Sequence, residues 1–377
     1  MNVSVAADPS VGDTISERLD RHGGVTTGFD YLRIGLAISV VLEHSVVVTD
    51  QLLAESLWST WPRIGLAIIM PAFFALSGFL VAGSLLKRNS LVSFVTLRVL
   101  RLAPALAVEV LLSALVIGPL LTTLPLSDYF SSPEFWRYFR NLYGDVQFIL
   151  PGLFAHNPFP DVINQSIWTI PFELDCYILL ALLSFIGFIK RPRYVLWLMG
   201  LLCVAGTAWL FIRYRPEWRF DGVPGRGLVL AFLTGVALNL YGQRIRLSGR
   251  LAAVSLALGM LLLFDMRLSF LAVIPIAYAT IYVGLLNPKK VPILMSGDYS
   301  YGIYLFAFPI QQAEVALMPG FAIWYDNAAI ALIASFAYAA MSWWFVERPI
   351  LSRRAELSVW VDRRLHQGWN SLFSRAR

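Results

Sequence analysis

The chain has 377 residues, and 58% of them are hydrophobic while only 14% are charged. Soluble domains usually carry about 25% charged residues, so this composition excludes an ordinary soluble protein. The net charge of +6 arises from Lys and Arg clusters that long apolar segments separate. A nucleic-acid-binding face is excluded as well, because it needs basic residues gathered on one folded surface.

The first 28 residues are polar and mixed in charge, without the pattern of a cleavable signal peptide. We expect residues 1–28 to form a cytoplasmic tail that is disordered or loosely attached.

Ten apolar segments follow, and most are near the ~20 residues that a helix needs to cross a bilayer. The sequence therefore predicts an all-α fold, a polytopic transmembrane helix bundle of about ten spans, in a membrane domain at residues 29–348. The seventh and eighth spans should form a tight hairpin, because only residues 265–267 separate them. The expected spans are 31–49, 64–86, 94–122, 167–189, 194–212, 226–242, 251–264, 268–286, 299–318 and 324–346.

Basic residues gather in alternate loops, which places both termini in the cytoplasm and the protein in the inner (plasma) membrane. The loop 213–225 carries arginines on the opposite side, which indicates either an external anionic ligand or solvated helix ends. The long aromatic loop 123–166 is expected to fold over the outer mouth of the bundle. The cytoplasmic tail 349–377 has the pattern of a basic amphipathic helix lying on the inner membrane surface.

The first span carries Arg33 and His44, and ionisable residues inside a span are costly and indicate function. The two positions are eleven apart, so they share one helix face and lie about 16 Å apart along its axis. Histidine suits general-base chemistry at neutral pH, although a structural histidine between helices is the alternative. Glu43 either faces lipid headgroups or orients the imidazole, from which it points about 100° away.

The second and third spans add packing residues and a basic pair. Ser77 and Gly78 indicate close helix approach, and Ser77 lacks the GxSxG turn of a nucleophile. Arg98 and Arg101 lie on adjacent turns of one face, where they either clamp phosphate groups or anchor the helix at the cytoplasmic mouth. Glu109, two turns further on, is a buried charge that needs a partner.

The fourth and ninth spans supply the remaining candidates. Glu173 could orient His44, bind a sugar hydroxyl or be hydrated near the outer face, and Tyr177 shares its helix face. Trp168 suits a membrane interface. Tyr301 and Tyr304 stand about one turn apart, with interface anchoring or packing as the alternative to a role in the site. The two cysteines, Cys176 and Cys203, are expected to be buried and inert.

Together these segments resemble the acyltransferase family 3 membrane proteins, which modify glycans and other extracytoplasmic acceptors. Six segments resemble the family's motifs in order, and the match covers nearly all of the chain beyond residue 28. They are DYLRIGLAISVVLEHS, FFALSGFL, RVLR, SIWTIPFELDCY, DYSYGIYLFAFP and FVERP. Many members carry a second histidine where this chain has Ala307, and no hydrolase-like domain is expected at the C-terminus.

The resemblance implies acyl-CoA, most commonly acetyl-CoA, as a donor bound from the cytoplasm, with Arg98 and Arg101 near its phosphates and Arg33 positioning it. His44 would act as the base or accept the acyl group, and Glu173 is a further catalytic candidate. The acceptor would be a hydroxyl of a glycan or lipid-linked oligosaccharide, with the lipid bilayer and polysaccharide-assembly proteins as partners and no metal. Candidates for substrate binding are Trp168, Tyr177, Tyr301 and Tyr304.

A transporter of a glycan or small molecule is the main alternative, because buried Arg, His and Glu also suit proton-coupled export. The sequence contains no evident internal repeat, and the ordered motifs favour the enzyme. A non-catalytic subunit of a glycan export system is disfavoured because His44 is present.

Overall fold

The computed structural model describes residues 13–87, 90–213, 222–292, 296–318, 323–354, 356–358 and 361. Within these residues the regular structure is helical, apart from one isolated antiparallel bridge between Thr14 and Arg246. The predicted all-α class is confirmed. Most of the expected C-terminal amphipathic helix, with His366, and most of the arginine-rich loop 213–225 lie outside the described residues.

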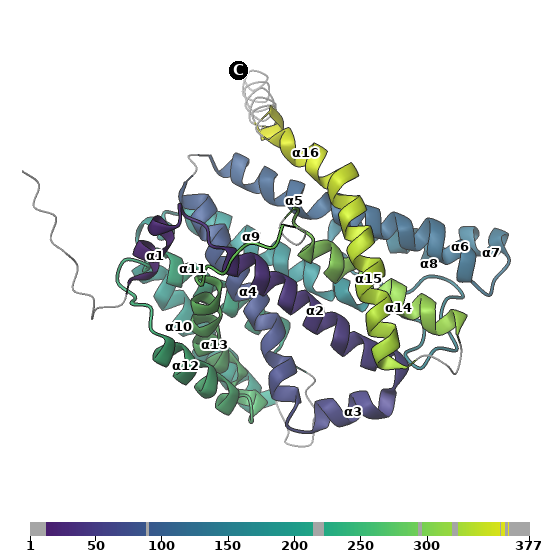
Figure 1. Ribbon diagram of the computed structural model, residues 1–377, viewed down its shortest axis with the longest axis horizontal. Coiled ribbons are helices and arrows are strands. Elements are labelled where there is room, and N and C mark those ends of the chain that lie inside the picture. Colours follow the sequence, from purple (N-terminus) through teal and green to yellow (C-terminus); the bar gives the residue numbers. More distant parts are fainter. Residues whose placement is uncertain are drawn as a thin grey trace, which may run out of the picture. The chain divides into compact units, whose positions relative to one another are not determined.

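The helices follow one another through the whole described chain (Figure 1). They are α1 (Ile15–Arg21), α2 (Thr27–Thr49), α3 (Gln51–Ser59), α4 (Arg63–Leu86), α5 (Leu91–Leu112), the π turn η1 (Ser113–Ile117), α6 (Gly118–Leu121), α7 (Leu126–Ser131), α8 (Pro133–Tyr138), η2 (Phe139–Tyr143), η3 (Gln165–Thr169), α9 (Ile170–Phe185), η4 (Phe188–Lys190), α10 (Arg193–Arg213), α11 (Gly225–Leu240), α12 (Gly249–Leu262), η5 (Met266–Leu268), α13 (Ser269–Gly284), α14 (Ser300–Leu317), α15 (Trp324–Ser342), the π turn η6 (Trp343–Glu347) and α16 (Arg348–Ser352).

All ten apolar segments are helical, but the expected number of ten spans is not confirmed. Among the described residues, seven helices are long and apolar enough to cross a membrane. The other three segments form α11 with 16 residues, α12 with 14 and α14 with 18. A helix of 14 residues is only about 21 Å long, which is shorter than a bilayer core of about 30 Å.

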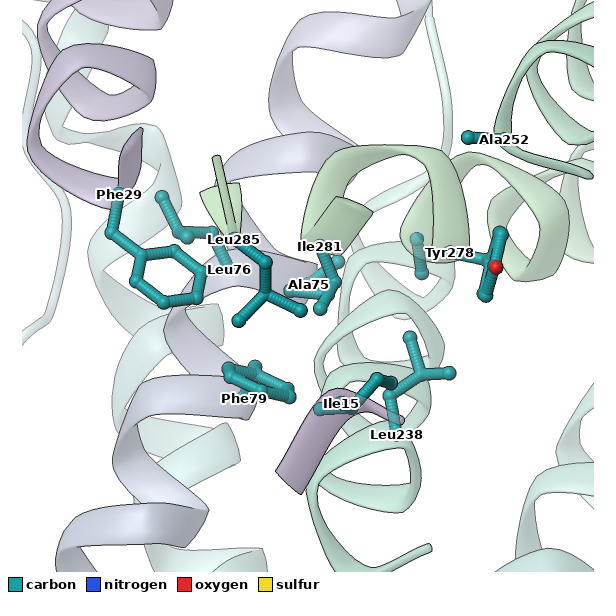
Figure 2. Close-up of a cluster of buried hydrophobic side chains, with 11 residues drawn as sticks. Ile15, Phe29, Ala75, Leu76, Phe79, Leu238, Ala252, Tyr278, Ile281 and Leu285 are labelled. Atoms are coloured by element: carbon teal, nitrogen blue, oxygen red, sulfur yellow. The ribbon is translucent and has the colours of Figure 1, made fainter. Parts of the chain in front are cut away.

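The chain divides into two compact units, and the first holds residues 1–32, 70–83 and 186–290. Its core gathers apolar side chains from helices that are far apart in sequence, including Phe29, Phe79 and Ile281, each almost fully buried (Figure 2). The hairpin expected at residues 265–267 is present, because Asp265 caps η5 by accepting from the Arg267 backbone N–H at 3.0 Å, and α13 follows at once.

Glycines let α4 and α11 approach each other closely within this unit. A Cβ atom at Gly78 would lie 2.0 Å from the Phe232 carbonyl oxygen, and one at Gly235 would lie 2.0 Å from the Ala75 carbonyl oxygen. Neither position can hold a larger residue without backbone movement. The close helix approach expected at this pair is confirmed at Gly78.

Residues 13–28 are packed rather than loose, which corrects the expectation for this part of the tail. Thr14 and Glu17 form a capping box that starts α1. Ile15 is buried in the core of the first unit, and its backbone N–H donates to the Ile245 carbonyl at 3.0 Å. Leu19 also packs against this core, and the Thr26 hydroxyl donates to the Gly284 carbonyl at 2.5 Å, so several contacts attach the polar segment.

The second unit holds residues 33–69, 84–185 and 291–377. Both π turns lie in it, and each ends two residues before a proline: η1 before Pro119 and η6 before Pro349. Proline has no N–H to donate and its ring clashes with the carbonyl four residues earlier, so the preceding turn widens. α14 and α15 pack side by side in this unit.

Candidate active site

Asp298 joins two of the predicted arginines directly before α14. Its Oδ2 lies 2.5 Å from Arg101 Nη2 and 3.5 Å from Arg33 Nη1. Burial alone would raise the pKa of Asp298, but the Arg101 and Arg33 guanidiniums hold it below its usual range. One carboxylate thus faces two guanidiniums in this cluster.

The arginines lie deeper in their helix than expected. Ser90 caps α5 by accepting from the Ser93 backbone N–H, so the helix begins at Leu91 rather than near residue 94. Arg98 and Arg101 therefore lie about 10 and 15 Å along the axis from the helix start. Arg101 stacks over the Tyr301 ring at 6.0 Å, whereas Arg98 lies over Phe94 at 5.9 Å, one turn back on its own helix.

Further polar groups surround Arg101. Its charge interacts with Glu347 and with Tyr177, and it also interacts with Glu173. Glu347, which belongs to the FVERP segment, is 2% exposed and accepts from the Ser342 hydroxyl at 2.9 Å. The widened turn η6 turns this carboxylate inward instead of towards water.

Tyr304 extends the same row of polar groups along α14. Its hydroxyl donates to the Ser166 carbonyl at 2.8 Å and lies 3.1 Å from the Thr169 hydroxyl, both on η3. Tyr304 also interacts electrostatically with Glu173 and with Glu43. Tyr304 is therefore close enough to sense both carboxylates, Glu173 and the one that precedes His44.

His44 is buried in the second unit and its two ring nitrogens have different surroundings. Nε2 lies 3.4 Å from Glu43 Oε2, while the imidazole packs edge-on against Phe308 with ring centroids 5.0 Å apart. Glu43 Oε1 accepts from Trp58 Nε1 at 3.1 Å. Nδ1 is buried without a hydrogen-bond partner in the part of the chain that the structure describes.

Glu109 has hydrogen-bond partners on one of its two carboxylate oxygens, while Oε2 is buried without one among the described residues. It is fully buried, and its Oε1 accepts from Asn164 Nδ2 at 2.8 Å, the Ser113 hydroxyl at 2.9 Å and the Tyr138 hydroxyl at 3.2 Å. Asn164 also donates to the Leu305 carbonyl at 3.0 Å. Glu109 thereby ties the long segment after α6 to α5 and α14.

The structure thus brings together Arg33, Arg101, Glu173, Tyr177 and Tyr301. His44 and Tyr304 lie in the same compact unit. Trp168 is half-buried on η3 and packs against Phe172, with ring centroids 5.9 Å apart. Cys176 and Cys203 are free and buried, as expected.

The sequence did not predict Asp298 as a site residue, and it left two alternatives open for Glu43. Asp298 precedes a helix, where an aspartate usually reads as a cap, so its position gave no signal of an ion cluster. Glu43 was undecided because neighbouring helical residues point apart, but its side chain reaches back to Nε2. The carboxylate within ion-pair distance of His44 is Glu43, while Glu173 interacts with Arg101.

Comparison with known proteins identifies the family of the chain. The family model described as "Acyltransferase domain" (Acyl_transf_3) matches residues 26–347. The chain is 25% identical to an O-acetyl transferase of Shigella phage Sf6, over 86% of this chain and 96% of that protein. It is 26% identical to Nodulation protein 10 of Rhizobium leguminosarum bv. viciae, over 92% and 98%.

A third relative is the peptidoglycan O-acetyltransferase OatA of Listeria monocytogenes, 25% identical over 78% of this chain and 52% of that protein. No solved structure matches the chain. The family model spans most of the sequence and contains His44 and the arginine cluster. The chain therefore belongs to the acyltransferase family 3 and is a membrane acyltransferase.

Proposed function

We propose that this protein transfers an acetyl group from acetyl-CoA to a hydroxyl of a glycan or lipid-linked oligosaccharide of the cell envelope. One observation carries the proposal: a single compact unit holds an arginine pair suited to anions and a buried imidazole whose Nδ1 has no hydrogen-bond partner among the residues that the structure describes. Two of the relatives bear the name O-acetyltransferase, which supports acetyl as the group transferred.

Arg33 and Arg101 bind the phosphate groups of the donor in this proposal, and Arg98 contributes charge nearby. A guanidinium matches phosphate oxygens with two parallel donors, so it binds them in a defined orientation. Asp298 holds the two arginines in place before the donor arrives. Glu173, Tyr177, Tyr301 and Tyr304 line the route from these arginines towards His44, and Trp168 contacts the acceptor.

His44 acts as the general base. It takes the proton of the acceptor hydroxyl while that oxygen attacks the thioester carbonyl carbon, and the C–S bond then breaks. The proton passes from the imidazole to the thiolate, which leaves as CoA-SH, and the acceptor keeps the acetyl ester. Positioned general bases of this kind contribute about 10²–10⁴-fold to a rate.

Membranes that contain the protein would be supplied with radiolabelled acetyl-CoA and cell-envelope glycan. The proposal expects label in the glycan, and a KM for acetyl-CoA about tenfold or more higher in Arg101→Lys, because a lysine binds phosphate as a point charge. Arg137→Lys, at an exposed arginine of α8 outside the site, serves as the matched control. Glycan transport that needs no acetyl-CoA would favour an exporter instead.

A further inference from the structure

Glu43 and Trp58 carry polar groups beside His44 that have no role in the transfer reaction proposed above. Glu43 belongs to α2 and Trp58 to the short helix α3, which follows after one residue. The Glu43 carboxylate contacts both neighbours, with Oε2 3.4 Å from His44 Nε2 and Oε1 3.1 Å from Trp58 Nε1. The carboxylate therefore lies between an imidazole and an indole N–H.

We propose that Glu43 is the positioning residue of His44, held by Trp58, and that it makes Nδ1 the nitrogen that accepts the proton. The inference rests on the proposed function. A carboxylate accepts and never donates when ionised, so the ring nitrogen facing it carries the hydrogen. With Nε2 protonated, Nδ1 keeps its lone pair.

The surroundings of the ring agree with this assignment. Nδ1 is buried and has no hydrogen-bond partner among the described residues, so its lone pair is available to a substrate hydroxyl. Phe308 of α14 packs edge-on against the ring and restricts its rotation. A flip of the ring about Cβ–Cγ would place Cε1 where Nε2 now faces Glu43, so the N–H of Nε2 would lose that acceptor, which is costly in a buried site.

Trp58 fixes the carboxylate in turn. Its indole N–H can only donate, and donation to Oε1 leaves Oε2 to face the imidazole. The titratable group of α14 whose charge interacts with Glu43 is Tyr304, whereas α3 presents the neutral indole and Phe308 is apolar. Glu43 is thus the acid positioned to stabilise the imidazolium that forms when Nδ1 takes a proton.

The test compares Glu43→Gln, Glu43→Asp and Trp58→Phe in purified protein in proteoliposomes, with acetyl-CoA and glycan. Glu43→Gln should lower kcat by about 10²-fold or more while KM for acetyl-CoA stays within about twofold. The acidic limb of its kcat/KM profile should move to lower pH, because no charge then stabilises the imidazolium. Glu43→Asp keeps the charge and should restore part of kcat.

Trp58→Phe keeps the aromatic ring and removes only the donor, so it should give a smaller loss in the same direction. If Glu43→Gln fails to fold, Trp58→Phe tests the same inference. Glu55→Gln, an exposed carboxylate of α3, is the control and should match the wild type. An unchanged kcat in Glu43→Gln, or a loss without movement of the acidic limb, overturns the inference alone. Absence of transfer by the wild type overturns the proposed function as well.

Discussion

Arg101 Nη2 lies 2.5 Å from Asp298 Oδ2, so the residue expected to hold donor phosphate is already paired with a carboxylate. Arg33 shares that carboxylate at 3.5 Å. The guanidiniums of Arg101 and Arg33, which Asp298 holds in place, are therefore the same groups that a donor phosphate would contact. A substitution of Asp298 can therefore show separately how this carboxylate affects the stability of the protein and how it affects donor binding.

Replacing Asp298 with Asn should lower stability and increase the stabilisation by donor. About a quarter of each of the three side chains is exposed, so the loss should be about 1–3 kcal/mol, less than the 3–5 of a fully buried pair. Acetyl-CoA phosphate can then replace the lost charge, so saturating donor should raise the thermal midpoint more than in the wild type.

Thermal unfolding of purified Asp298→Asn, with and without acetyl-CoA, measures both effects. Asp175→Asn removes an exposed carboxylate of α9 and provides the control. Equal donor-induced shifts in Asp298→Asn and the wild type would show that the arginines do not receive the donor.

The same carboxylate predicts a pH dependence. The pKa of Asp298 is held below its usual range, and thus below the value near 3.9 of the unfolded chain. Its stabilisation is therefore complete above about pH 4 and is lost as the pH falls through the folded pKa. The stability difference between wild type and Asp298→Asn should be constant from pH 7 to about 5 and shrink only in stronger acid. A difference that disappears near neutral pH would contradict this.

Tyr138→Phe should destabilise the segment that Glu109 holds. Burial raises the pKa of Tyr138 well above its usual range, and the nearby Glu109 charge adds to this, so the phenol remains a donor at any physiological pH. Loss of that hydrogen bond should cost about 0.5–1.5 kcal/mol, seen as a lower thermal midpoint. Tyr143→Phe, at an 81% exposed residue, should leave the midpoint unchanged. Equal thermal midpoints in Tyr138→Phe and Tyr143→Phe would show that the hydrogen bond to Glu109 does not stabilise this segment.

Gly78→Ala tests the close approach of α4 and α11. The added Cβ would meet the Phe232 carbonyl, so the helices must separate, at a cost of about 1–3 kcal/mol or more. Gly200→Ala is the matched control, because a Cβ there has no atom within 4 Å. Unfolding midpoints should fall only for Gly78→Ala. A similar midpoint for both variants would mean that the helices are further apart.

The sequence predicted the ten helical segments because long apolar runs leave few other folds in a membrane. Helix starts were less accurate, since Ser90 caps α5 and starts it at Leu91 rather than near residue 94. The width of η6, which buries Glu347, depends on a proline six residues after the turn begins. The partners of Arg101 and His44 come from tertiary packing and side-chain reach, which helix periodicity does not encode.

The central claim is that His44 carries the chemistry of acetyl transfer. The most direct measurement is a single-turnover rate of acetyl transfer by purified protein in proteoliposomes, comparing wild type with His44→Gln at saturating labelled acetyl-CoA. Acetyl-CoA binding should be unchanged, since His44 is not among the groups paired with Asp298. The rate should fall by about 10²–10⁴-fold. A His44→Gln protein that transfers acetyl at the wild-type rate would contradict the account.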